Sequence, residues 1–182
     1  MACTSLVALP RACGVDGVMA GVQELYVISY NDLAPASGVA GTPIFTTTTG
    51  GVISDIGTAS GKFYVKVGLL KSTSGLKETL TKNLQNGVAF FTQEFSLVLS
   101  DLTTENSVFI QSVLNQPISI LLKTRTGKYF VAGLNGQFEL ATLEGGTGTA
   151  EADLTGHTLT FHGLETKLIP MVDPALIPTI IA

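Results

Sequence analysis

The feature that most constrains the fold is an unbroken succession of strand and helix patterns between Phe90 and Glu165. It begins with an alternating segment at 90–100, continues with one amphipathic segment at 101–116, and ends in short hairpins. Alternation of apolar and polar residues is typical of strands that cover a core with one face. A single helix pattern among such strands predicts a helix lying across a sheet. The sequence therefore predicts a mainly β (α+β) fold: an antiparallel β-sandwich or small barrel with one flanking amphipathic helix.

Turn residues separate the predicted strands. Asn86-Gly87 precedes the long alternating segment, and Thr126-Gly127 and Asn135-Gly136 divide the segments after the helix. Such pairs favour tight hairpin turns because glycine adopts a positive φ without strain. Within 23–30 apolar residues occupy both parities, which predicts a strand covered on both faces. The predicted strands span 23–30, 52–56, 62–70, 77–84, 90–100, 118–123, 128–132, 137–143 and 157–162.

Composition divides the chain into one domain and two extended terminal arms. Its 182 residues suit a single domain. Residues 1–21 are small, Gly-rich and aperiodic, which predicts an N-terminal arm, and a single β-sandwich domain is expected over 22–167. Within it, 31–59 is rich in Pro, Gly, Ser and Thr and predicts a long insertion loop, a kind of segment that is usually functional. Residues 168–182 are apolar but carry a proline at every fourth position, which predicts an extended C-terminal arm.

The overall composition excludes several classes of protein. The chain is 13% charged and 45% hydrophobic, so apolar surface is expected to be buried between subunits. A net charge of −4 and a pI near 5.0 argue against a basic nucleic-acid-binding domain. Cys3 and Cys13 form no disulfide framework and predict free thiols in a reducing compartment. The N-terminus lacks the features of a secretory signal, and no apolar run is long enough for a transmembrane helix.

The residues with reactive side chains form no recognisable catalytic arrangement. His157 and His162 are five apart on a predicted strand, so they point to opposite faces and cannot share a metal. The glycines of 145–148 lack the phosphate-loop pattern, because Glu151 stands where the third glycine belongs. Glu151 and Asp153 share a face if extended, but no other acid or histidine is tied to them by spacing. The sequence therefore predicts no enzyme, no cofactor and no metal site.

Charge is distributed in blocks along the chain. Residues 1–59 carry one basic residue against four acids, 60–128 carry eight against four, and 129–182 carry one against six. Solvated loops account for any single one of these charges. Taken together, the blocks also suit head-to-tail contacts between copies, in which opposite charges fix register and orientation.

The region from Tyr64 to Glu165 resembles the tail tube (major tail) proteins of tailed bacteriophages. It is more distantly similar to the tube-forming proteins of contractile injection and type VI secretion machines. The resemblance consists of the order strand, amphipathic helix, strand and hairpin, followed by a closing segment often seen in phage tail proteins. That segment is carried here by Gly146, Thr147, Gly148, Asp153, Gly156, Thr160, Phe161, Gly163 and Glu165.

The resemblance implies rings of six copies, stacked into a tube through which DNA passes. We therefore expect a virion structural protein, located in the phage tail and assembled in the host bacterial cytoplasm. Its expected partners are copies of itself and other virion tail or head proteins, with DNA only as transiting cargo and no membrane. A capsid decoration or head–tail connector protein is an alternative, and a monomeric β-sandwich ligand-binding module is an alternative from another class.

Two sets of residues follow from the tube interpretation. A lumen that passes DNA needs acidic or neutral walls, because basic walls would hold phosphates by counterion release. The lumen candidates come from the acidic C-terminal block: Glu139, Glu144, Glu151 and Asp153. The insertion loop and the apolar C-terminal arm are expected to contact neighbouring subunits. The assembly candidates are Pro35, Thr46, Thr47, Thr48, Thr49, Leu168, Ile169, Met171, Ile177 and Ile180.

Overall fold

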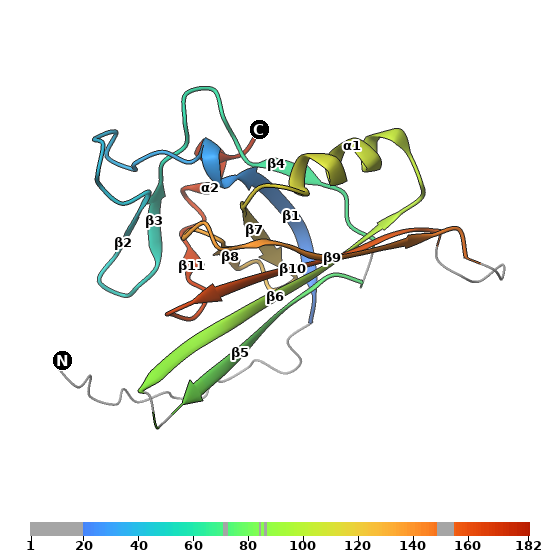
Figure 1. Ribbon diagram of the computed structural model, residues 1–182. Helices are drawn as coiled ribbons and strands as arrows, with labels where there is room; N and C mark the ends of the chain where they lie inside the picture. The colour runs from blue at the N-terminus through green and yellow to red at the C-terminus, as the bar shows by residue number, and fades with distance from the viewer. Residues whose placement is uncertain (1–19, 71–72, 84, 86, 149–154) are drawn as a thin grey trace.

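The chain folds into two β-sheets that pack face to face, with one main helix beside them (Figure 1). The computed structural model describes residues 20–70, 73–83, 85, 87–148 and 155–182. Of the predicted N-terminal arm, only residues 20 and 21 are described. Asn86 of one predicted turn lies outside the described residues. The mainly β architecture with a flanking helix, predicted from alternation and the single helix pattern, is confirmed.

The elements fall into three groups. The seven-stranded sheet contains β1 (Val22–Ser29), β2 (Phe45–Thr47), β3 (Ile53–Ile56), β4 (Val65–Val67), β7 (Ile118–Thr124), β8 (Tyr129–Ala132) and β11 (Met171–Val172). The four-stranded sheet contains β5 (Gly75–Asn83), β6 (Val88–Ser100), β9 (Glu139–Gly146) and β10 (Gly156–Glu165). The helices are η1 (Tyr30–Asp32), α1 (Thr104–Val113) and α2 (Ile177–Ile180).

The main core lies between the two sheets. The strand order is β2-β3-β11-β8-β7-β1-β4 in the larger sheet and β5-β6-β10-β9 in the smaller one. From the smaller sheet, Phe95 and Leu97 of β6 and Phe161 of β10 are at most 1% exposed. The rings of Phe138 and Phe161 stack with their centroids 6.1 Å apart. This burial follows directly from period-two alternation, because every second residue of β6 and β10 faces the other sheet.

A second core covers the opposite face of the seven-stranded sheet. Tyr26 and Leu121, whose neighbours in sequence face the main core, point instead toward β3 and the C-terminal segment. Tyr64 is fully buried there, and its hydroxyl donates to Ser119 Oγ at 2.9 Å while Ser119 donates to the Ala132 carbonyl at 2.9 Å. The middle strands of this sheet are therefore apolar on both faces because both faces are covered, as the alternation over 23–30 predicts.

The helix begins later than the sequence pattern indicates. Thr103 is its N-cap, and the Thr103 hydroxyl accepts from the Asn106 backbone N–H at 3.2 Å. Asp101, at which the sequence pattern starts the helix, instead has a φ of 74° and accepts from the neighbouring Leu102 N–H at 2.8 Å. Both residue types can cap a helix. Asp101 is used in the turn that redirects the chain after β6, which corrects the predicted start at residue 101.

The insertion at 31–59 is more ordered than a loop, because it contains the hairpin of β2 and β3. This hairpin joins the larger sheet through β11, which pairs in parallel with β3 at Val172 and Ile53. Alternation over 52–56 predicts β3, whereas the threonine run masks β2. The insertion therefore forms one edge of the seven-stranded sheet.

The C-terminal segment folds back onto its own domain. It forms β11 between β3 and β8, and then the short helix α2, with Pro178 in the first turn, where proline is tolerated because that N–H needs no helical partner. Ile177 is 5% exposed and Ile180 is 3% exposed in the second core. This corrects two expectations, since the segment is not fully extended and these two residues lie in the chain's own core instead of against a neighbouring subunit.

Candidate functional site

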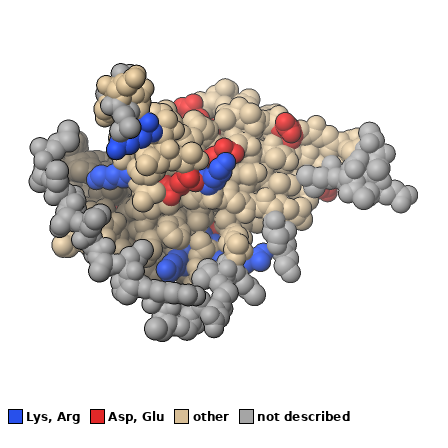
Figure 2. Space-filling model, turned by 90° about the horizontal axis from the view of Figure 1, so that it is seen from below, with Lys and Arg blue, Asp and Glu red and all other residues tan. Residues whose placement is uncertain are grey.

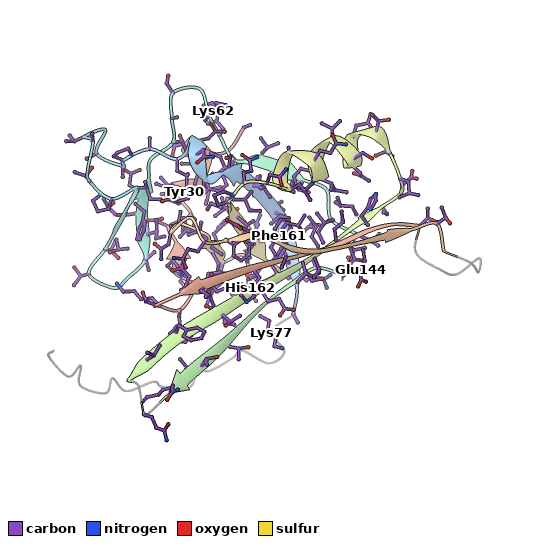
Figure 3. The ribbon with its side chains drawn as sticks, viewed as in Figure 1. Tyr30, Lys62, Lys77, Glu144, Phe161 and His162 are labelled. Carbon is purple, nitrogen blue, oxygen red and sulfur yellow. The ribbon has the colours of Figure 1, made fainter. Side chains whose placement is uncertain are left out.

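The outer face of the four-stranded sheet is a regular surface that the described residues leave open. Adjacent residues of β10 show the division: Phe161 is 1% exposed in the main core, and His162 is exposed on the other face (Figure 3). The strand register places Lys77, Glu94, His162 and Glu139 side by side across all four strands. One row of charged side chains therefore crosses this face.

Two of the four predicted lumen acids lie on this outer face. Glu139 is opposite His162 and Glu144 is opposite Thr158, and both are exposed. Glu151 and Asp153 lie outside the residues that the structure describes. Glu94, which the acidic-block argument omits, is exposed on the same face. Its position could have been read from β6, because Glu94 precedes the buried Phe95 in a strictly alternating segment.

Uncharged polar residues make up most of the rest of this face. The register places them on the same face as Glu94 and Glu144, and they are Thr79, Thr92, Ser96, Thr142, Thr158 and Thr160. Seen from below, most of the visible described surface is neither acidic nor basic (Figure 2). Among the residues that the structure describes, no ion pair within 4.0 Å joins two side chains of this face. The face is therefore polar with a few unpaired charges.

Both edges of the four-stranded sheet are open in the described part of the chain. β5 pairs only with β6, and β9 pairs only with β10. Each edge is long, with nine residues in β5 and eight in β9. An edge strand presents unpaired backbone N–H and C=O groups and is a template for pairing with another chain.

The hairpin of β5 and β6 extends past the seven-stranded sheet (Figure 1). Near its tip Leu80 is 54% exposed and Val88 is 49% exposed, whereas Phe95 further along β6 is fully buried. A two-stranded hairpin alone is at best marginally stable in water. This projecting end therefore offers apolar surface that the described chain does not cover.

A groove of about 550 Å³ lies beside this hairpin, between the β2–β3 turn and residues 165–171. Gln93 lines it and is 1% exposed; its Nε2 donates to Glu78 Oε1 at 3.1 Å, while its Oε1 has no partner among the described residues. Glu165 also lines the groove and accepts from Asn135 Nδ2. Burial raises the pKa of the Glu165 carboxyl, an effect that the Asn135 hydrogen bond opposes.

A second groove, of about 630 Å³, lies between α1 and the segment of β4. Its walls include Phe109 and Gln116 of the helix side and Val65 and Leu70 of the strand side. Val65 is 60% exposed and Leu70 is 38% exposed. Most of the lining is apolar, with a few polar groups, so this groove has the character of a small-molecule site.

The charged side chains on the seven-stranded sheet form a network that links the neighbouring strands β4, β1 and β7. Glu24 lies 3.8 Å from Lys66 Nζ and 3.7 Å from Lys123 Nζ, and accepts from the Tyr26 hydroxyl at 2.9 Å. The Tyr26 hydrogen bond, with the two lysines, lowers the pKa of Glu24 against the opposing effect of burial. Burial and the Glu24 carboxylate raise the pKa of Tyr26 to about 12. Glu24 therefore stays a carboxylate and Tyr26 stays a neutral phenol at neutral pH.

The predicted assembly residues divide into exposed and buried groups. Thr46 to Thr49 are exposed on β2 and its turn, and Pro35 is half-buried. In the C-terminal segment Leu168 is 60% exposed and Met171 is 39% exposed, while Ile169 packs against the main core. Leu168 and Met171 line the groove beside the hairpin, so the exposed members of the set gather on one side of the molecule.

No cluster of three or more His, Cys, Asp or Glu side chains in the described residues could hold a metal ion. None of the described helices is both long and apolar enough to span a membrane. In comparisons with known proteins, no family model, no curated protein and no solved structure matches this chain.

Proposed function

We propose that this chain is a self-assembling structural subunit of a phage tail tube. The observation that carries the proposal is the four-stranded sheet, which buries one face in the main core and leaves the other face and both edges open. A monomeric protein normally blunts or covers such edges. Pairing with further copies would use them.

The edges suit closure into a ring. If β5 of one copy pairs with β9 of the next, the four-stranded sheets become one continuous sheet whose edges vanish on closure. Barrels of about 16 or more strands enclose an aqueous channel. Six copies of a four-stranded sheet, the number that the family resemblance implies, exceed that threshold.

The outer face suits the wall of a channel for DNA. In such a ring the main core and the larger sheet lie outside, and the row of Lys77, Glu94, His162 and Glu139 faces the lumen. Threonines and carboxylates outnumber the one lysine of that row, so the wall gives phosphates little to bind by counterion release. DNA would then pass as cargo, and the stable partners would be other copies and other tail or head proteins of the virion.

A ligand-binding module is the second candidate, because the 630 Å³ groove beside α1 falls within the size range of small-molecule sites. In that function the chain would act as a monomer, and the open sheet edges would have no role.

Negative-stain microscopy and sedimentation of the purified full chain test the proposal. The tail tube function predicts rings or tubes with a central channel, increasing in length with protein concentration. Single rings that never stack would favour the connector alternative. A discrete monomer at all concentrations would contradict the proposal and leave the ligand-binding module.

A further inference from the structure

We infer that copies of this chain associate end to end, with the hairpin end of one copy against the helix end of the next. The inference rests on the proposed function, to which it adds the contact that stacks one ring on another and the direction of stacking. The occupant of each end is therefore a second copy of this chain. The argument depends on where two exposed surfaces lie and on their charges.

The hairpin end is the surface at the start of β6. Lys82 pairs in register with Ala89 there, and Ile169 N–H donates to Glu78 Oε1 at 2.8 Å, which holds the segment after β10 against the hairpin. The contact brings three exposed apolar side chains and two exposed lysines to this end. They are Leu80, Val88 and Leu168, with Lys82 and Lys167.

The helix end is the surface at the other end of β6. Asn106 Nδ2 donates to the carbonyls of Ser100 at 3.0 Å and of Asp101 at 2.9 Å, which fixes the start of α1 on the end of the strand. Two exposed apolar side chains and three exposed acids gather here. They are Leu102 at 42% and Val108 at 61% exposure, with Asp101, Glu105 and Glu144.

These two ends lie too far apart to contact each other within one copy. β6 has 13 residues, and a strand rises about 3.4 Å per residue, so roughly 40 Å separates them. Figure 1 shows the hairpin tip and α1 at opposite ends of the four-stranded sheet. Neither end can therefore cover the other within one copy.

The ends are complementary in charge as well as in apolar character. Neither 98–116 nor 139–160 contains a lysine or arginine. Lys82 and Lys167 form no ion pair with any residue that the structure describes. The Glu165 carboxylate at the hairpin end is half-buried and already accepts from Asn135. A basic apolar surface thus faces one way along the strands and an acidic apolar surface faces the other, an arrangement that fixes orientation between partners.

The contact joins two different surfaces at opposite ends of the strands, so it can repeat along a line, one copy after another. The edge strands β5 and β9 form the two sides of the sheet, whereas the hairpin end and the helix end lie at opposite ends of its strands. Edge pairing within a ring and end contact between rings therefore use separate parts of the molecule and can occur together.

Charge reversal tests the inference with a matched set of full-length variants. The first reverses the hairpin end with Lys82→Glu and Lys167→Glu, and the second reverses the helix end with Glu105→Lys and Glu144→Lys. The third combines all four changes. The control, Lys62→Glu with Lys128→Glu, makes the same change in net charge as the first variant at exposed residues outside both ends. Stacking is measured by sedimentation velocity and tube length in micrographs at low salt, after circular dichroism shows that each variant is folded.

Each end-reversed variant alone should need at least about tenfold more protein to stack, since attractive pairs become repulsive. An equimolar mixture of the two should stack again, because each reversed end then meets a complementary one. The four-change variant should stack with itself, the control should behave as the unaltered chain, and high salt should weaken all differences.

Folded end-reversed variants that stack normally, or a mixture that fails to recover, would overturn the inference while leaving the ring proposal standing. Rings of the unaltered chain that never stack would overturn it in the same way. An unaltered chain that remains monomeric would overturn the inference and the proposed function together.

Discussion

The chain covers the faces and edges of its two sheets to different degrees. The seven-stranded sheet has apolar residues on both faces of β1 and β7, and the chain supplies the cover for both, from the other sheet and from its own C-terminal segment. The four-stranded sheet has one covered face, two open edges and a hairpin that extends beyond its support. The buried contacts that stabilise the fold therefore lie mainly between the two sheets and on the far face of the seven-stranded sheet. The four-stranded sheet carries the exposed surfaces that other molecules could contact.

The largest expected effect separates the two faces of β10. Phe161→Ala should lower the free energy of unfolding by about 3–5 kcal/mol, because it empties a site in the main core against Phe138. Thr160→Val, one residue earlier on the outer face, should change it by less than about 0.5 kcal/mol. Urea unfolding of both variants measures the difference, and equal losses would break the distinction between the faces.

The next effect tests whether the C-terminal segment belongs to its own domain. Ile180→Ala should cost about 2–4 kcal/mol, since Ile180 is 3% exposed in the second core. Thr179→Ala, its exposed neighbour, serves as the control. If Ile180→Ala reduces assembly but leaves monomer unfolding unchanged, the segment packs on a neighbour and the original expectation of an intersubunit arm is restored.

A smaller effect concerns the groove beside the hairpin. Burial raises the pKa of Glu165, so the folded state favours the neutral acid and the charged form costs stability above the folded-state pKa. Stability from this group should therefore rise as pH falls through the folded-state pKa toward the unfolded value of 4.5. Glu165→Gln should remove that dependence in pH-resolved unfolding. A variant with the same pH profile as the unaltered chain would contradict this account.

The smallest effect on stability is expected on the outer face of the four-stranded sheet. Glu94→Lys with Glu139→Lys should leave the free energy of unfolding within about 1 kcal/mol of the unaltered chain, since both side chains are exposed. In an assembled tube the same change should retain DNA and slow its passage, most strongly at low salt. Lys62→Glu with Asp32→Lys, an ion pair between η1 and the loop before β4, is the control. DNA passage at the normal rate at every salt concentration would show that this face is not the lumen.

The local sequence pattern predicted most strands of both sheets, because the alternation of apolar and polar residues can be read within each segment. The buried and exposed parities of β6 and β10 follow from Phe95, Phe161 and Glu94 alone. The hairpin joined by Thr126-Gly127 was also accessible, since a tight turn needs only neighbouring residues. The predicted turn at Asn135-Gly136 joins no hairpin, because β8 before it belongs to the seven-stranded sheet and β9 after it belongs to the four-stranded sheet.

Long-range pairing was not accessible from local pattern. β11 has two residues, and it pairs with β3 at a separation of more than a hundred positions and with β8 at about forty. A two-residue strand has no periodicity that could predict it. Proline spacing in the C-terminal segment correctly argued against a long helix, but it could not show that Pro178 occupies the first turn of a short one. Block charge predicts Glu139 and Glu144, which lie on the outer face of the four-stranded sheet, but omits Glu94, because that acid lies in a block of net positive charge.

Disulfide cross-linking between copies tests most directly the central claim that β5 of one copy pairs with β9 of the next. In a Cys3→Ser, Cys13→Ser background, Thr79→Cys on β5 is combined in turn with cysteine at Ala141, Thr142 or Leu143 on β9, since cross-strand partners in a sheet lie about 4.5–5.5 Å apart. Oxidation of the assembled protein should give a ladder of covalent oligomers ending at one ring size in at least one register. A control that combines Thr79→Cys with Thr46→Cys on β2 should give none. Rings or tubes that form no ladder in any of these registers, or that cross-link equally well through β2, would contradict the account.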